Sequence, residues 1–287
     1  MRTETVENWT SIIKPKTKWF EFNLKEIWEY RDLIYIFVKR DIVSINKQTV
    51  LGPLWFFLGP LFTVVIYTLV FNKIADISTD NIPAPLFYLA GTTMWGYFQT
   101  CFLSTTTTFT ANAALFGKVY FPRLVAPISI IISNLLKFFI QLLMFICFWI
   151  YYLKGASLKE PITPNIYLML LPLLIIMMGG IALGAGIIIS SLTTKYRDLS
   201  YFVSFGITLL MYITPVIYPV SAIPEDFRFL IQYNPISPII ETFRYGFTGF
   251  GNHDINSLLY SFISMVILLL VGIVLFNKTE KNFMDTV

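Results

Sequence analysis

Acidic side chains are absent from a long central part of the sequence: no Asp or Glu lies between Asn81 and Lys159. Charged residues make up only 13% of the 287 residues and hydrophobic residues 56%, with a mean hydropathy of +0.68. Because average soluble domains carry about 25% charged residues, this composition predicts an integral membrane protein. Proton relays in carriers use carboxylates inside the spans, so the acid-free stretch argues against transport driven by protons or sodium ions bound midway.

Motifs for nucleotide binding and catalysis are also missing. The chain contains no G-x-x-x-x-G-K-[ST] loop, so it cannot hydrolyse ATP by that route. Its one histidine, His253, leaves neither a metal-ligand cluster nor a Ser-His-Asp set, and we interpret it as structural or neutral. No enzymatic activity, metal or cofactor is therefore expected in this chain.

A disulfide framework and a cleaved signal peptide are not expected either. The two cysteines, Cys101 and Cys147, fall within apolar stretches, where a free cysteine behaves as a small apolar residue. The first apolar run begins only after some 50 polar and amphipathic residues, which predicts an uncleaved anchor.

Six apolar segments are long enough to cross a bilayer, for which about 20 residues are needed. They are residues 53–72, 86–109, 127–152, 166–192, 199–220 and 256–276. The predicted fold is an all-α membrane protein with six transmembrane helices. Its predicted parts are a cytoplasmic N-terminal segment (1–50), the membrane domain (51–277) and a cytoplasmic tail (278–287).

Lys and Arg residues are distributed unevenly about these segments. Fifteen of the 21 lie before the first span or in alternate connections, five lie in the opposite connections, and Lys137 lies inside a span. The positive-inside rule then predicts that both termini are cytoplasmic. The dispersal of the basic residues argues against a nucleic-acid surface.

The segment before the first span predicts an amphipathic helix at the cytoplasmic interface. Asn23 and Glu26 resemble a capping box, and basic side chains on the segment suit lipid headgroups. The apolar residues that recur at helical spacing are Ile27, Tyr30, Ile34 and Phe37. Two interpretations remain open: a helix that only rests on headgroups, and a docking platform for a cytoplasmic partner.

Short helices are predicted in two of the connections. The half-apolar segment 114–123 has the composition of a small helix parallel to the membrane. Between spans five and six, prolines interrupt a stretch too apolar for a solvated loop. Pro224 and Ser237-Pro238 suit the starts of two short helices that enter the outer leaflet partway.

Two features inside the spans have both a structural and a functional interpretation. Gly180 and Gly184 in span four form a small-xxx-small pattern, which we interpret as close helix packing. Lys137 in span three is costly in a bilayer and therefore suggests a function, although it also suits a polar cavity or the membrane interface.

Aromatic and hydroxyl side chains recur on single helix faces in spans one, two and five. Rings that stack on sugars, with hydroxyls that exchange weak hydrogen bonds, would suit a sliding sugar polymer. The alternative is ordinary helix packing together with the interfacial aromatic belt. The candidate channel-lining residues are Phe56, Thr63, Tyr67, Tyr88, Trp95, Gln99, Phe102, Tyr201, Phe205, Thr208 and Tyr212.

Five short motifs, taken in order and spacing, resemble the permease subunits of type-two ABC exporters that move lipid-linked polysaccharides such as O-antigen or teichoic acid. They are Trp28 to Leu33, Lys39-Arg40-Asp41, Gln48 to Trp55, Tyr196-Arg197-Asp198 and Tyr233-Asn234-Pro235. The resemblance covers nearly the whole chain.

This resemblance implies a second copy of the chain around a channel in the bacterial inner membrane, and two separate ATPase subunits that bind ATP and Mg. Leu51 and Gly52 would form the cytoplasmic entrance of the channel. The outer short helices would shape its exit. The residues implied in coupling to the ATPase are Arg31, Asp32, Lys39, Arg40, Asp41, Gly117, Lys118, Arg123, Arg197 and Asp198.

Three other functions remain as alternatives. An exporter of a small lipid, drug or peptide would share the same architecture. An ion-coupled secondary carrier is disfavoured by the missing intramembrane acids and by the absence of repeat symmetry. A membrane-embedded glycosyltransferase or acyltransferase is disfavoured by the single histidine and the lack of an acidic pair.

Overall fold

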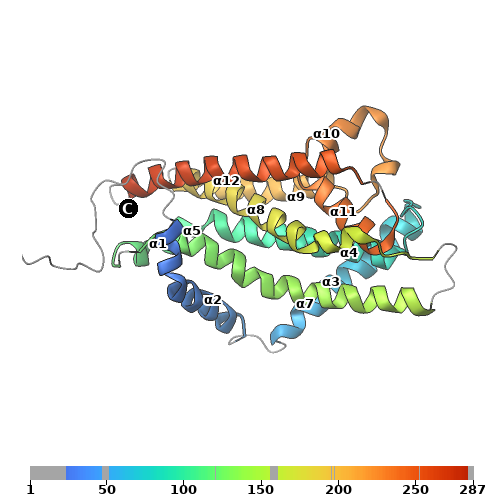
Figure 1. The fold of residues 1–287 in the computed structure, drawn as a ribbon, viewed down its shortest axis with the longest axis horizontal. Coiled ribbons are helices and arrows are strands. Elements are labelled where there is room, and N and C mark those ends of the chain that lie inside the picture. The colour runs from blue at the N-terminus through green and yellow to red at the C-terminus, as the bar shows by residue number, and fades with distance from the viewer. Residues whose placement is uncertain are drawn as a thin grey trace, which may run out of the picture.

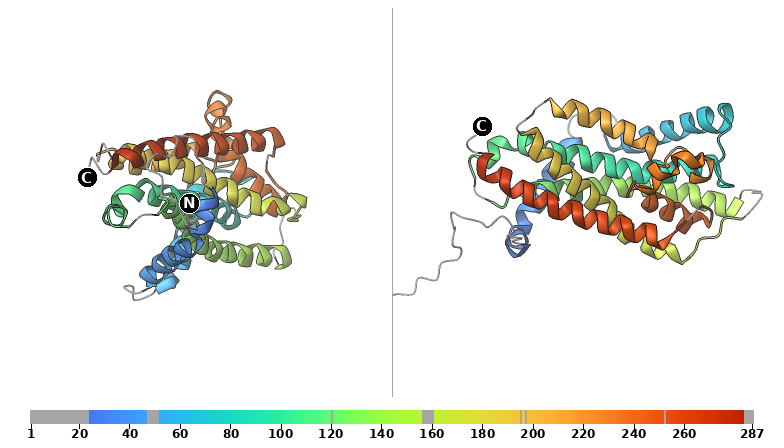
Figure 2. Two further views of the ribbon diagram at one scale, coloured as in Figure 1. Left: turned by 60° about the vertical axis from the view of Figure 1, so that its left-hand side comes forward. Right: turned by 90° about the horizontal axis from the view of Figure 1, so that it is seen from above.

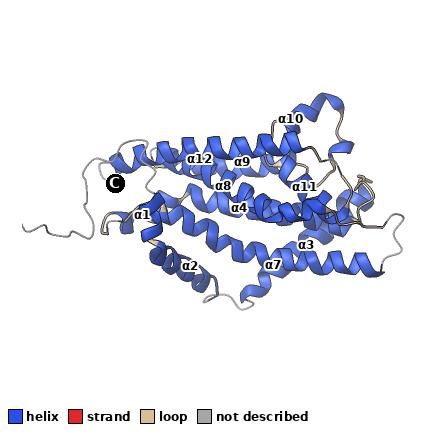
Figure 3. Ribbon diagram, viewed as in Figure 1, coloured by secondary structure: helices blue, strands red, loops and turns tan. Residues whose placement is uncertain are grey.

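The computed structural model describes residues 24–46, 52–119, 121–155, 161–194, 196, 198–251 and 253–283, and these residues form helices and loops without a strand (Figures 1 and 3). The elements are α1 (Leu24–Glu29), α2 (Arg31–Asn46), η1 (Gly52–Leu54), α3 (Trp55–Tyr67), η2 (Thr68–Ile74), α4 (Ala84–Thr106), α5 (Thr108–Ala111), α6 (Ala113–Phe116), α7 (Val125–Gly155), η3 (Ile166–Leu170), α8 (Leu171–Thr193), α9 (Leu199–Ile213), η4 (Val220–Ala222), η5 (Glu225–Phe227), α10 (Arg228–Gln232), α11 (Ser237–Thr248) and α12 (Ile255–Phe283). The prediction of an all-α membrane protein is confirmed.

The long helices form an elongated bundle with two distinct ends (Figure 1). Helix α1 and the end of α12 lie at one end, which we call the terminal end. Helices α10 and α11 lie at the opposite end, which we call the far end. The two short helices predicted between the last two spans are therefore present as α10 and α11.

Four helical segments among the described residues are long and apolar enough to cross a membrane. They are Trp55–Ile74, Val125–Lys154, Ile166–Thr193 and Ile255–Thr279. Helix α4 has 23 residues but is less apolar, and α9 has only 15 residues. The chain is thus a multi-pass membrane protein, and the count of six spans stays a prediction.

Two predicted spans end earlier than expected. The span 199–220 stops as a helix at Ile213, because Thr214 precedes Pro215 and takes the extended conformation that a following proline favours. Helix α4 stops at Thr106 within a run of four threonines. The hydroxyls of Thr105 and Thr106 donate to the carbonyls of Cys101 and Leu103 at 2.7 and 2.8 Å, and such bonds compete with the helix backbone.

The small helix predicted at 114–123 is shorter and earlier than expected. Helix α6 ends at Phe116 and turns lead from there towards α7. The segment contains Gly117 and Pro122, both poor residues for a helix interior.

Helices α4 and α8 form the centre of the bundle, and glycines set how closely α8 approaches its neighbours. A Cβ on Gly184 would lie 2.7 Å from the backbone carbon of Leu268 in α12. A Cβ on Gly186 would lie 2.6 Å from the Cβ of Thr105 in α4. The predicted packing role of the glycines in span four is confirmed, because a larger residue at these positions would separate the helices.

A second, smaller core lies at the terminal end. The ring of Phe37 in α2 meets that of Phe121 at 5.8 Å between centroids, and Phe109 stacks on Phe276 of α12 at 4.5 Å. Helix α2 also packs along α7. The predicted N-terminal helix is therefore anchored to the bundle by its apolar face.

Candidate functional site

The aromatic candidates on α9 lie on the surface of the described chain. Tyr201 is 81% exposed and Tyr212 is 57% exposed, and Phe205 and Thr208 are exposed between them. In the view from above, α9 (gold) lies at the edge of the bundle (Figure 2). This face is available to lipid or to another protein.

The candidates on α4 are placed differently. Tyr88 and Trp95 are buried in the main core, while Gln99 and Phe102 are half-buried. The ring of Tyr88 contacts that of Tyr67 at 5.9 Å. The two buried rings therefore serve helix packing within this chain, which was the alternative interpretation of the aromatic pattern. Helix packing and channel lining use the same 3.6-residue spacing, so spacing alone does not separate them.

The candidates on α3 are half-buried. The ring centroid of Phe56 lies 6.0 Å from the ammonium nitrogen of Lys137 on α7. The same ammonium group donates a hydrogen bond to Asn134 Oδ1 at 2.9 Å. The amide of Asn134 and the ring of Phe56 therefore take the place of water around the charge of Lys137. Thr63 is also half-buried, and its hydroxyl donates to the carbonyl of Gly59 at 3.0 Å.

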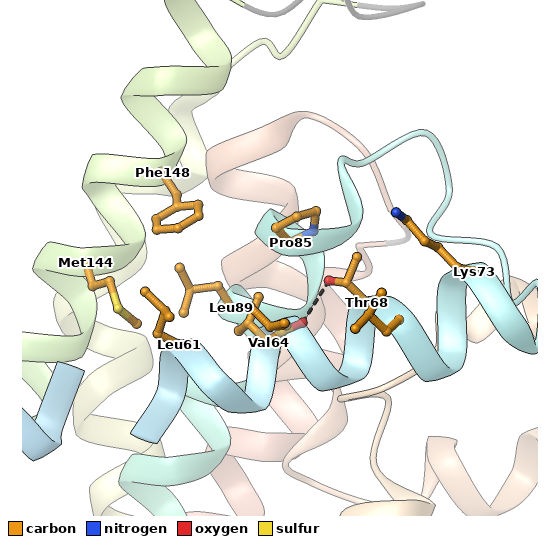
Figure 4. A pocket seen from close by; sticks show the side chains of 10 residues that line it. Leu61, Val64, Thr68, Lys73, Pro85, Leu89, Met144 and Phe148 are labelled. Atoms are coloured by element: carbon orange, nitrogen blue, oxygen red, sulfur yellow. Dashed lines mark hydrogen bonds between the residues drawn. The ribbon is translucent and has the colours of Figure 1, made fainter. Parts of the chain in front are cut away.

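An apolar pocket of about 220 Å³ lies between α3, α4 and α7 (Figure 4). Leu61, Val64 and Phe148 are among its lining residues, and Lys73 lies at one end. The hydroxyl of Thr68 is turned back to the carbonyl of Val64 at 2.8 Å. The walls therefore suit an apolar chain and offer little to orient a sugar.

The coupling candidates on α2 divide into outward and inward residues. Arg31, Asp32 and Lys39 are exposed on α2. Arg40 pairs with Asp41 at 2.8 Å. The second carboxylate oxygen of Asp41 accepts a hydrogen bond from Ser133 of α7 at 3.3 Å, so Asp41 ties α2 to the bundle.

The remaining coupling candidates lie in two connections. Gly117 and Lys118 are exposed after α6, and Arg123 is half-buried with its guanidinium 5.5 Å from the ring centroid of Phe116. Asp198 is exposed before α9. Two further predicted residues, Leu51 and Arg197, lie outside the described residues.

Gly52 adopts a left-handed backbone conformation at the start of the first span. Its φ is +49°, which glycine tolerates and side chains with a Cβ rarely adopt. The position directly before Pro53, at the start of the first span, therefore favours glycine.

A buried ion pair at the far end was missed by the sequence analysis, which counted Arg244 among the charges of an outer connection. Arg244 is only 1% exposed, and its guanidinium contacts Glu241 Oε1 at 3.0 Å. It also donates to the carbonyl of Val216 at 2.8 Å and lies 3.8 Å from the ring centroid of Phe87 in α4. This residue is therefore a structural anchor of α11.

Gly91 in α4 makes room for this anchor. A Cβ at this position would lie 2.6 Å from Arg244 Nη2 and 2.7 Å from the carbonyl oxygen of Val216. The available sequence signal was the Glu-x-x-Arg spacing on an otherwise apolar helix, because a charge that is buried in such a place needs a partner.

His253 is part of an aromatic stack. Its ring lies 3.8 Å from that of Tyr245 at an angle of 13°, and 4.7 Å from that of Tyr167. Among the described residues no group of three or more His, Cys, Asp or Glu side chains is placed to hold a metal ion. His253 therefore packs against two tyrosine rings, which is consistent with its interpretation as a structural residue.

Comparison with known proteins gives the family. Residues 32–248 match the model of the ABC-2 type transporter family. The chain is 32% identical over 255 residues to an O-antigen export system permease protein, RfbA, of Klebsiella pneumoniae, covering 88% of this chain and 94% of that protein. It is 25% identical over 267 residues to the protein of the same name from Myxococcus xanthus, covering 92% and 98%. The chain is therefore a member of the ABC-2 type transporter family.

Proposed function

We propose that this chain is the membrane-spanning permease subunit of an ATP-powered exporter that moves a lipid-linked polysaccharide across the bacterial inner membrane. The observation that carries the proposal is the similarity to O-antigen export permeases over 88% of this chain and 94% of the relative. A substrate of the O-antigen or teichoic-acid type is consistent with that similarity.

The energy would come from separate subunits. The sequence lacks a nucleotide loop, so two partner ATPases would bind ATP and Mg. Their contact surface would include the exposed residues of α2 and the turn after α6 at the terminal end. Because α2 packs along α7 and is tied to it through Asp41 and Ser133, a displacement of α2 would be passed to a long helix of the bundle.

The channel would form between two copies of the chain. The exposed aromatic face of α9 is the part of the predicted lining that faces outward from this chain, whereas the candidates on α3 are half-buried. With both termini in the cytoplasm, as the distribution of Lys and Arg predicts, α10 and α11 would lie on the outer side of the membrane.

Deletion of the gene tests this function. We expect loss of surface polysaccharide and accumulation of the lipid-linked polymer inside the cell, measured by gel analysis of surface and total glycan. Complementation should require both this chain and a co-purifying ATPase with an intact nucleotide loop. Normal surface polysaccharide in the deletion strain would contradict the proposal, and would favour export of a small lipid, drug or peptide.

A further inference from the structure

A polar cavity of about 700 Å³ lies at the far end of the bundle. Its walls come from segments that are distant in the sequence: the turn between η2 and α4, the segment around η4, helix α10, and helix α11. Its polar lining includes Asp80, Asn81, Ser221, Arg228, Gln232 and Glu241. The fold, rather than any local motif, therefore brings these groups together.

The turn that supplies Asp80 has an unusual backbone. Asp76, Asp80 and Asn81 all have positive φ values, of 52°, 49° and 64°. Asp and Asn adopt this conformation more readily than other residues with a side chain. The hydroxyl of Ser221 donates a hydrogen bond to the carboxylate of Asp80, whose two oxygens lie 2.7 and 2.8 Å from it. This bond joins the turn to the segment before α10.

A second cavity, of about 220 Å³, adjoins the first. Gln232 and Glu241 line both cavities. The second cavity adds Ser237, His253 and Asp254 to the polar lining. The two cavities are thus neighbours that share part of their lining, around α10 and the first turns of α11.

Ser237 is the clearest sign that this region takes a ligand. Its side chain is only 3% exposed, it lines the smaller cavity, and its hydroxyl has no hydrogen-bond partner within the described parts of the chain. A buried hydroxyl without a partner is unfavourable, so a group that enters the cavity and bonds to it would remove that penalty.

The charges of the lining restrict the class of ligand. Asp80 and Asp254 contribute carboxylates, and Glu241 contributes one that is paired with Arg244. A hydrogen bond from the Ser257 hydroxyl lowers the pKa of Asp254, so it stays ionised. Among the described residues that line the larger cavity, the one cation is Arg228, whose guanidinium lies 3.7 Å from the carboxylate of Glu225. This environment disfavours a phosphate group. Carboxylates beside amides and hydroxyls suit the hydroxyl groups of a neutral sugar, which both donate and accept.

We propose that these two neighbouring cavities bind neutral sugar units of the exported polymer as it leaves at the far end. The inference rests on the proposed function, because that function brings a glycan to this end of the protein. The smaller cavity lies below the range of about 300–1,000 Å³ that is typical of drug-sized ligands, which suits a single sugar ring there. The Ser237 hydroxyl and the amide of Gln232 would bond to the sugar.

Saturation-transfer difference NMR tests the proposal on the full-length permease with its ATPase partner in nanodiscs. The probe is a set of oligosaccharides released by mild acid from the surface polysaccharide of the source bacterium. We expect transfer to sugar ring protons with the wild type. Ser237→Ala should weaken the apparent affinity about three- to tenfold, the effect of one neutral hydrogen bond. Gln232→Leu, at an exposed position, should act in the same direction.

A matched serine separates binding from folding. Ser191 is also buried, but its hydroxyl donates to the carbonyl of Ile187 at 2.8 Å and it lies in the last turn of α8, outside both cavities. Ser191→Ala should leave oligosaccharide binding unchanged. Ser237→Ala should keep or raise thermal stability, because it removes an unpaired buried hydroxyl, and weaker binding of this variant therefore cannot come from unfolding.

Three results would overturn the site. They are no transfer with the wild type, equal binding by Ser237→Ala and wild type, and displacement of the oligosaccharide by sn-glycerol 3-phosphate, which would assign the cavities to a lipid headgroup. These outcomes are distinct from failure of the proposed function. Persistent surface polysaccharide in the deletion strain removes the function, whereas loss of polysaccharide there combined with unaffected binding by Ser237→Ala removes only the site.

Discussion

Substitution of Gly91 by alanine should destabilise the protein, although alanine normally favours a helix. In a helix interior alanine is better than glycine by about 0.5–1 kcal/mol. At Gly91 the added Cβ would lie 2.7 Å from the carbonyl oxygen of Val216 and 2.6 Å from Arg244 Nη2. The carbonyl belongs to the backbone and cannot rotate away, so either α4 shifts or Arg244 loses its hydrogen bond.

The magnitude follows from these contacts. Overpacking in a well-packed core costs about 1–3 kcal/mol. Separation of a buried charge from its partners costs about 3–5 kcal/mol. Even if only part of the second effect applies, the sum exceeds the gain in helix propensity, so we expect a net loss of about 2–4 kcal/mol in the free energy of unfolding.

The assay compares two glycine-to-alanine variants in detergent by thermal unfolding followed with size-exclusion chromatography. Gly206 in α9 is the control, because a Cβ there meets nothing within 4 Å. Gly206→Ala should be neutral or slightly stabilising. If Gly91→Ala unfolds at the same temperature as Gly206→Ala, the argument from the Arg244 anchor is refuted.

Three further predictions concern the ion pair, the exposed rings and the intramembrane lysine. Glu241→Leu alone should lower stability by about 3–5 kcal/mol, because it leaves Arg244 buried without its carboxylate, and Arg244→Met added to it should restore much of the loss; thermal unfolding measures both. Tyr201→Ala with Tyr212→Ala should leave expression and ATP hydrolysis unchanged, because both rings are exposed, but should reduce surface polysaccharide on gels. Lys137→Ala should alter the export rate, measured as the appearance of surface polysaccharide after induction, because the ammonium group lies beside Phe56 of the predicted lining.

Each of these predictions has a contradicting outcome. The ion-pair argument fails if the double variant is as unstable as Glu241→Leu. Unchanged surface polysaccharide in the tyrosine variant would remove α9 from the channel wall. A wild-type export rate in Lys137→Ala, at normal expression, would assign that lysine a purely structural position.

The helices were largely predictable, because their signals are local. Apolar runs of bilayer length, the Gly180/Gly184 pair and the start at Ser237-Pro238 each depend on residues close in the sequence. The predicted boundaries were wrong where a local effect ends a helix early. Pro215 ended α9 and the threonine run ended α4.

The candidate site was less predictable than the helices. The spacing places Tyr88 and Tyr201 on similar aromatic helix faces, yet Tyr88 is buried and Tyr201 is 81% exposed. A helix has one face toward its own bundle and others toward lipid or a partner, and aromatic side chains suit all of them.

By itself, the sequence determined that this chain is helical and spans a membrane, since hydropathy and helix length are properties of contiguous residues. Only the tertiary structure decided that Arg244 is an internal anchor, that Gly91 must be glycine, and that Ser237 opens into a polar cavity. The first two facts depend on contacts of α4 with the segment after α9 and with α11, which lie more than a hundred residues further along the chain. The third depends on the walls that the segment around η4, α10 and α11 supply to the cavity. Such contacts leave no periodic mark in the sequence, because each requires only one complementary residue on each side.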